Sequence, residues 1–210
     1  MLRLALLFAP AVACADLTVT VAGADGRPLP EVVVTVTRLD AAVTLPHVKK
    51  TAVMDQVNKA FVPQVLVVSA GTSVEFPNSD SVSHQVYSFS APKRFQLSLY
   101  KGEAHPPVQF DRPGLVVLGC NIHDSMVGYI YVADTPWFGR TDAQGRASFA
   151  DLPAGRFRLQ LWSPTIADDA RSLTRDIDVA AEPRTVAFKL SRELRALPEP
   201  RPHADGWDAY

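Results

Sequence analysis

The chain has 210 residues, of which 47% are hydrophobic and 20% charged, so it can bury a core and is not a disordered polypeptide. Its formal net charge of −1 gives no basic excess, which excludes nucleic acid as an expected partner. The 17 prolines and 11 glycines interrupt short runs of Val, Thr, Phe and Tyr, which favours an all-β fold.

The N-terminus has the pattern of a secretory signal peptide. Arg3 precedes a short apolar run, and Ala13-Cys14-Ala15 forms an A-x-A cleavage site. We therefore expect residues 1–15 to be removed and the rest of the chain to be exported to the periplasm. The alternative is that Cys14 is the acylated cysteine of a lipoprotein, although Ala11 is a poor start for a lipobox, and only then would the protein be attached to a membrane.

The two ends of the chain share a strand-rich pattern. Residues 17–38 alternate around Asp25-Gly26, which predicts a β-hairpin. Residues 140–164 contain two further turn signals, at Asp142 to Gly145 and at Leu152 to Gly155, between alternating strands. Both ends therefore have the pattern of a sandwich.

The middle of the chain, residues 51–133, contains the larger apolar runs and the one cysteine that follows the predicted cleavage site. Short runs rich in β-branched and aromatic residues predict strands. The candidates are Ala52 to Gln56, Gln64 to Ser69, Ser73 to Pro77, His84 to Ser88, Leu115 to Cys120 and Gly128 to Val132. After the second sandwich-like segment, residues 191–210 contain three prolines and little periodicity, which predicts an extended or mobile tail.

The segment "GLVVLGCNIHDSMVGYIYV", Gly114 to Val132, places Cys120, His123 and Met126 in the connection between two strand-forming runs. A connection this short brings three side chains toward one point. A thiolate, an imidazole and a thioether form a soft ligand set that suits copper, especially if a further imidazole completes it.

The candidate for that further imidazole is His84, which stands at the start of a predicted strand after a turn-rich segment. At the same end of a sandwich it can reach the connection that holds the other three residues. His84, Cys120 and His123 would form the trigonal plane of a type 1 copper site, and Met126 its long axial ligand. Such a site carries single electrons.

Other readings of the same residues stay open. With the signal peptide removed, Cys120 has no partner for an internal disulfide, so it is a metal ligand, an intermolecular bridge or an inert buried residue. Met126 is a possible core filler. A c-type haem needs C-x-x-C-H, a binuclear copper centre needs two thiolates, and structural zinc prefers sets without methionine. A nucleophilic Cys120 could use His84 as its base, but Met126 would then have no role.

Three segments resemble the cupredoxins, the small blue copper proteins of the plastocyanin and amicyanin group. They are "AFVPQVLVVSAGTSVEFPN", "SHQVYSF" and "FDRPGLVVLGCNIHDSMVGYIYV", which follow in the family's order between residues 51 and 133. The resemblance implies a Greek-key sandwich over residues 46–133, with copper ligands at His84, Cys120, His123 and Met126. The whole chain is similar to bacterial periplasmic proteins labelled methylamine utilisation protein.

The chain departs from that family at two places. The family has Asn after the first histidine, where a backbone N–H approaches the thiolate and the side chain ties the ligand loops together, and here Gln85 stands there. We expect the backbone bond to survive better than the side-chain tie. Ile122 replaces the proline before the loop histidine, and Asp124 places a carboxylate after it. We expect electrons to enter and leave through the outward edge of the His123 ring, so this carboxylate would lie beside that route.

The flanks resemble a transthyretin-like sandwich of the carboxypeptidase regulatory-like type. The resemblance implies that residues 16–45 and 134–190 form one discontinuous domain into which the copper domain is inserted. The alternative of two unrelated β pieces is weaker, because neither hairpin alone buries enough surface. Such sandwiches are mostly adaptors.

The sequence thus predicts an exported, non-enzymatic electron carrier that cycles one copper between Cu(II) and Cu(I). Its expected partner is a redox protein such as a c-type cytochrome or a periplasmic oxidoreductase. The alternatives are a copper-binding adaptor or copper-delivery protein that does not cycle, and an interaction module with a vestigial site.

Overall fold

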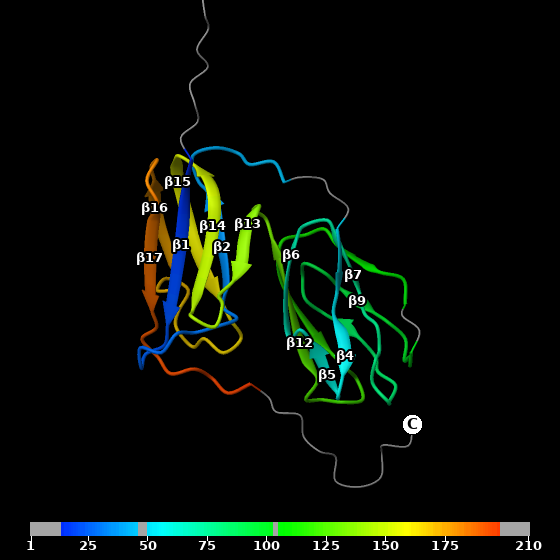
Figure 1. Cartoon of the computed structure of the whole chain (residues 1–210). Coiled ribbons are helices and arrows are strands. Elements are labelled where there is room, and N and C mark those ends of the chain that lie inside the picture. Colours follow the sequence, from blue (N-terminus) through cyan, green and yellow to red (C-terminus); the bar gives the residue numbers. More distant parts are fainter. Residues whose placement is uncertain (1–13, 46–49, 103–104, 198–210) are drawn as a thin grey trace, which may run out of the picture.

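A computed structural model describes residues 14–45, 50–102 and 105–197. Within these ranges the regular structure consists of β-strands, so the all-β prediction is confirmed for this part of the chain. The strands form two units, each with its own cluster of buried hydrophobic side chains. We name them the flanking unit and the central unit (Figure 1).

The flanking unit is built from both ends of the chain and has two sheets. The three-stranded sheet has the order β14 (Arg146–Pro153), β1 (Cys14–Ala22), β17 (Arg184–Lys189). The four-stranded sheet has the order β13 (Trp137–Arg140), β2 (Val33–Arg38), β15 (Gly155–Trp162), β16 (Thr174–Val179). The strands that precede the central unit, β1 and β2, therefore each lie between two strands that follow it.

The alternation of apolar residues explains why these strands stack into a sandwich. Leu17 and Val19 of β1 are fully buried, while Thr18 between them is partly exposed. Phe157 and Leu159 of β15 are likewise buried and belong to the same hydrophobic cluster. Because side chains of a strand alternate between its two faces, each sheet turns one apolar face toward the other.

The predicted hairpin over residues 17–38 is wrong. A turn does form at Gly26, whose φ is 81°. However, β1 pairs with β14 and β17, and β2 pairs with β13 and β15, so the two strands enter opposite sheets. The ten residues between β1 and β2 carry the chain across the sandwich instead of reversing it within one sheet.

The central unit has a five-stranded sheet, a three-stranded sheet and a hairpin. The first has the order β6 (Val65–Ser69), β12 (Val127–Ala133), β11 (Gly114–Gly119), β8 (Tyr87–Ser88), β9 (Phe95–Gln96). The second has the order β10 (Val108–Phe110), β7 (Thr72–Glu75), β3 (Thr51–Val53), and the hairpin joins β4 (Asp55–Val57) to β5 (Ala60–Val62). Its buried cluster includes Phe76, Phe110 and Ile130 together with Cys120 and Met126.

Five of the six strand candidates in the middle of the chain are confirmed. Four of them correspond to β6, β7, β11 and β12, and the candidate from Ala52 to Gln56 corresponds to the short strands β3 and β4. The predicted strand from His84 to Ser88 is strand only at Tyr87–Ser88, because His84 makes an isolated bridge to Tyr100 instead of continuing the ladder. Strands β5, β9 and β10 were not predicted. Each has only two or three residues, which is too short for periodicity to reveal.

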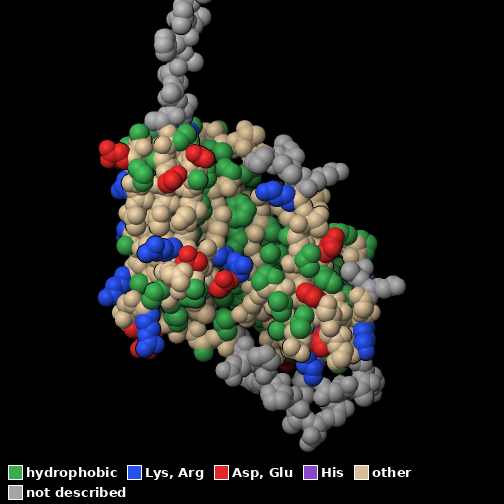
Figure 2. Space-filling model, in the orientation of Figure 1, with side chains coloured by type: hydrophobic (Ala, Val, Ile, Leu, Met, Phe, Trp, Pro, Cys, Tyr) green, Lys and Arg blue, Asp and Glu red, His purple; other side chains and the backbone are tan. Residues whose placement is uncertain are grey.

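The two units touch through aromatic side chains. Trp162 of the flanking unit lies with its ring centre 5.5 Å from that of Tyr129 and 5.9 Å from that of Tyr131, both on β12. Arg140 donates a hydrogen bond to the backbone oxygen of Val65 across the same junction. Figure 2 shows hydrophobic side chains gathered on the visible face where the units meet.

The segment predicted as a mobile tail begins with residues that are held in place. Backbone N–H groups of Ser191 and Arg192 donate to the carboxylate of Asp168, and that of Arg195 donates to the backbone oxygen of Thr165. Residues 198–210 of that prediction lie outside the described residues, as does the predicted signal peptide except for its last two residues, which begin β1. In the described part of the chain no helix is long and apolar enough to cross a bilayer.

Candidate metal centre

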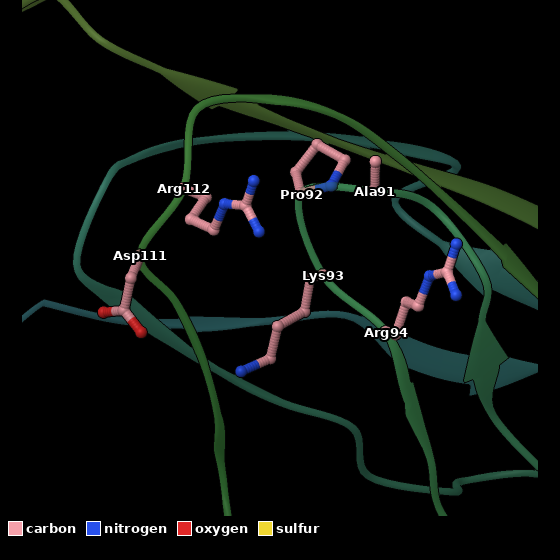
Figure 3. A pocket seen from close by; sticks show the side chains of 6 residues that line it. All are labelled: Ala91, Pro92, Lys93, Arg94, Asp111 and Arg112. Carbon is pink, nitrogen blue, oxygen red and sulfur yellow. The ribbon is translucent and has the colours of Figure 1, made fainter.

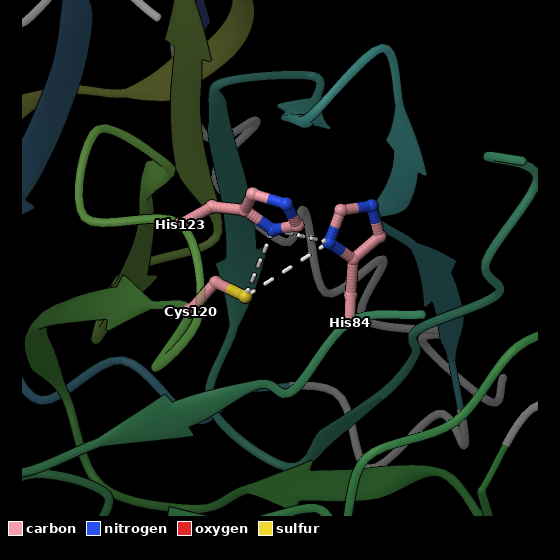
Figure 4. A group of neighbouring side chains, drawn as sticks. All are labelled: His84, Cys120 and His123. Atoms are coloured by element: carbon pink, nitrogen blue, oxygen red, sulfur yellow. Dashed lines mark hydrogen bonds between the residues drawn. The ribbon is translucent and has the colours of Figure 1, made fainter. Parts of the chain in front are cut away.

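Three of the four predicted ligands meet inside the central unit. The Nδ1 atoms of His84 and His123 lie 3.1 Å apart, and the Sγ atom of Cys120 lies 3.9 Å from the first and 3.7 Å from the second (Figure 4). All three residues are buried, and among the described residues they form the one group of histidine, cysteine or acidic side chains arranged to hold a metal ion. Met126 is buried in the same cluster as Cys120.

The strand register explains why Cys120 and His123 come together. Gly119, the last residue of β11, pairs with Val127, the first of β12. The residues between them therefore leave and return at one point, and the backbone N–H of Met126 closes the turn by donating to the oxygen of His123 at 2.9 Å. The short connection predicted from the sequence thus directs the side chains of Cys120 and His123 inward.

His84 is fixed by a paired backbone contact. Its N–H donates to the oxygen of Tyr100 and its own oxygen accepts from the N–H of Tyr100, at 2.9 and 3.0 Å. The hydroxyl of Tyr100 donates to the backbone oxygen of Phe76 and accepts from the amide of Gln56. Burial raises the pKa of Tyr100 to about 12, so the hydroxyl stays a donor at neutral pH. The backbone of His84 is therefore anchored, through Tyr100, to strand β4 and to the residue that follows β7.

Asp80 orients the ring of His84, and we did not predict this role from the sequence. Its Oδ2 atom lies 3.0 Å from Nε2 of His84 and accepts the backbone N–H of Lys59 at 2.6 Å. Burial opposes the charge of Asp80, but these donors outweigh it and hold the pKa of the carboxyl below its usual value. The side chain of Asn78 accepts the N–H of Asp80 and so fixes the loop. In the sequence, Asp80 stands in "NSDSVSH", where Asp also serves ordinary turns.

The environment of Cys120 favours its thiolate. Burial alone would raise its pKa, but a hydrogen bond from His84 and the backbone N–H groups of Gln85 and Ile122 lower the pKa below that of an ordinary thiol. Burial also lowers the pKa of His84, but the contacts of its ring with Cys120 and Asp80 outweigh burial and raise that pKa above the usual value. The backbone bond expected from Gln85 is present, although the family's Asn is not.

The donor atoms fit one metal ion. The three measured separations define a triangle whose corners all lie about 2.1 Å from a common interior point. Metal bonds to imidazole nitrogen of about 2.0–2.1 Å and to thiolate sulfur of about 2.3 Å are of this size. Two imidazoles and a thiolate, with a buried thioether nearby, are the donor types of a trigonal copper site with a weak axial ligand. The group resembles a type 1 copper site.

The four residues differ in their access to solvent. The exposed fraction is 0% for His84, 2% for Cys120, 1% for Met126 and 8% for His123. The neighbouring Ile122 is 41% exposed, and Asp124 is also exposed. The loop between β11 and β12 is therefore where the group comes closest to the surface.

Comparisons with known proteins give partial likenesses. No protein-family model matches the chain, and no curated protein matches it. Among solved structures, a copper-containing nitrite reductase from Thermus scotoductus is 28% identical, with a TM-score of 0.38. The match covers 47% of this chain and 26% of the nitrite reductase, so this chain spans about a quarter of that protein. A reduced amicyanin variant is 21% identical with a TM-score of 0.37, covering 42% of this chain and 87% of amicyanin. A purple cupredoxin from Nitrosopumilus maritimus is 24% identical with a TM-score of 0.33, covering 40% of this chain and all (100%) of that protein.

Proposed function

We propose that this protein is an exported electron carrier whose central unit holds one copper ion. The convergence of two buried imidazole Nδ1 atoms and one buried thiolate on a common point carries the proposal. His84, Cys120 and His123 would bind the ion, with Met126 as a weak fourth ligand. The bound ion would supply the reversible exchange of a single electron between Cu(II) and Cu(I).

The protein's own contribution is to hold the donors still. Asp80 fixes the ring of His84 so that Nδ1 faces Cys120. Backbone N–H groups of Gln85 and Ile122 hold the thiolate in one position. A site whose donors are already placed changes little between two oxidation states, which suits rapid electron exchange. The surrounding apolar cluster keeps water away from the donors.

Burial of the ligands favours electron transfer over copper delivery. A delivery protein passes its metal by exchanging ligands one at a time with an acceptor, so its ligands need to be reachable. Here the most accessible of the four, His123, is 8% exposed, and the other three are at 2% or less. An electron can cross a thin protein wall that a metal ion cannot.

The flanking unit supports a role in docking. It contains no group of potential metal ligands among its described residues, and its sequence resembles transthyretin-like adaptor sandwiches. We propose that it positions the central unit next to a redox partner in the periplasm, such as a c-type cytochrome or an oxidoreductase. The N-terminal sequence pattern supports export.

Voltammetry of the copper-loaded protein tests the proposed function. A reversible one-electron wave, lost in the Cys120→Ser variant, is expected of an electron carrier. Tight Cu(I) binding without any reversible wave would instead support copper delivery. Absence of copper binding would leave the interaction module.

A further inference from the structure

A basic pocket lies on the central unit, away from the metal centre. It has a volume of about 500 Å³ and is lined by Ala91, Pro92, Lys93, Arg94, Asp111 and Arg112 (Figure 3). The first four residues belong to the loop between β8 and β9, and the last two to the loop between β10 and β11. Three side-chain cations and one carboxylate give the pocket a formal charge of +2, in a chain whose net charge is −1.

The loop between β8 and β9 is held against strand β11, so its shape is set before any ligand arrives. Gly114 has a φ of 131°, and a Cβ atom there would lie 2.7 Å from the ring of Pro92. Pro92 therefore lies against Gly114, where only glycine leaves it room. The hydroxyl of Ser90 accepts the backbone N–H of Val117, and the N–H of Lys93 closes a turn onto the oxygen of Ser90.

The cations of the pocket form no ion pair within the described part of the chain. Arg38 and Arg158 of the flanking unit each contact an aspartate at 2.7 Å. In contrast, none of the acidic groups in the described ranges forms an ion pair with Lys93, Arg94 or Arg112. Figure 3 shows the carboxylate of Asp111 turned away from the guanidinium of Arg112, although the two residues are neighbours in the chain.

We propose that this pocket binds a phosphate-type oxyanion, either free or as the headgroup of an anionic lipid. The guanidinium of Arg112 and the ammonium of Lys93 supply directional N–H donors and positive charge, the combination that recognises phosphate oxygens. The guanidinium of Arg94 points to the other side of the loop in Figure 3 and adds to the local positive charge. Phe89, in the same loop, is 74% exposed and would enter the interface if the source were a lipid surface.

The pocket is distinct from the metal centre. Its residue Asp111 and its support Gly114 adjoin the start of β11, whereas Cys120 follows the end of that strand. A six-residue strand spans about 20 Å, so an anion in the pocket does not touch the metal ligands. Bound there, it would leave the loop of His123 open to a partner.

Isothermal titration of the full chain with inorganic phosphate at low ionic strength tests the proposal. We expect saturable binding that weakens as NaCl is added, because salt screens exposed charges. The variant Lys93→Gln/Arg94→Gln/Arg112→Gln should bind at least about tenfold more weakly, since three charged donors are lost. The control Arg146→Gln/Arg171→Gln/Lys189→Gln removes the same charge from the flanking unit and should stay within about twofold of the parent protein.

Cosedimentation with vesicles separates the two sources of phosphate. Binding to vesicles that contain phosphatidylglycerol but not to pure phosphatidylcholine, lost in both the pocket variant and Phe89→Ser, would assign the site to a lipid headgroup. Phosphate binding without vesicle binding would assign it to a free oxyanion. If neither phosphate nor anionic vesicles bind, or if the pocket variant binds as well as its control, the proposal is wrong.

Discussion

The Oδ2 atom of Asp80 lies 3.0 Å from Nε2 of His84, and both side chains are nearly or fully buried. This contact occupies the outer nitrogen of the imidazole, which leaves Nδ1 facing Cys120 and His123. The carboxylate also accepts the backbone N–H of Lys59, so the hairpin β4–β5 and the ring of His84 are fixed by one group.

Replacing Asp80 with Asn should weaken copper binding without unfolding the protein. An amide oxygen can still accept a hydrogen bond but no longer carries the charge that holds the ring. Loss of such an outer partner commonly lowers metal affinity by about 10- to 100-fold. Competition with a chromophoric Cu(I) chelator measures this change. Asp111→Asn, at the opposite end of the central unit, is the matched control, and an equal affinity in both variants would mean that Asp80 does not orient His84.

Substitutions of Met126 should change the reduction potential more than the copper content. A thioether is a weak axial ligand, so Met126→Gln, with a harder oxygen donor, should lower the potential, and Met126→Leu, with no donor, should raise it. Met54 is a fully buried methionine of the same cluster, so Met54→Leu controls for a change in packing and should leave the potential where it was. Complete loss of copper from Met126→Leu would show that the methionine is more than an axial ligand.

Deleting residues 16–45 should unfold the flanking unit and spare the central unit. The deletion removes nearly all of β1 and the whole of β2, each of which pairs with strands on both sides. Strands β14 and β17 then lose their partner β1, strands β13 and β15 lose their partner β2, and the buried cluster loses six of its twenty residues. Limited proteolysis should yield a copper-binding fragment of the central unit. A resistant fragment that spans β13–β17 would contradict the shared sandwich.

The exposed carboxylate of Asp124 should speed the approach of a basic partner. It lies next to His123, the most accessible of the four predicted ligands. Complementary charge acts mainly on association rate and is screened over about 8 Å at physiological ionic strength. Asp124→Asn should therefore slow electron transfer to a positively charged cytochrome severalfold at low salt, with a smaller effect at high salt. Stopped-flow rates equal to those of the parent protein at low salt would place the docking face elsewhere.

The ligand loop could be predicted from the sequence because its members lie within seven residues of one another, between two runs that must be strands. His84 could be predicted because the loop supplies one imidazole and a type 1 copper site uses two. Asp80 could not be found, since its role depends on a fold that brings the turn at Lys59 to the same carboxylate. The false hairpin over residues 17–38 has the same origin: alternation indicates strands, but it does not show which sheet each strand enters.

Absorption spectroscopy during addition of Cu(II) to the purified protein tests the central claim most directly. If Cys120 and the two histidines bind copper as proposed, one equivalent should produce an intense visible thiolate-to-copper band in the parent protein. The Cys120→Ser variant should give no such band while its far-ultraviolet circular dichroism remains that of the parent, because the flanking strands keep their apolar residues. A parent protein that stays colourless, or a band that persists in Cys120→Ser, would contradict the assignment of this group as a type 1 copper centre.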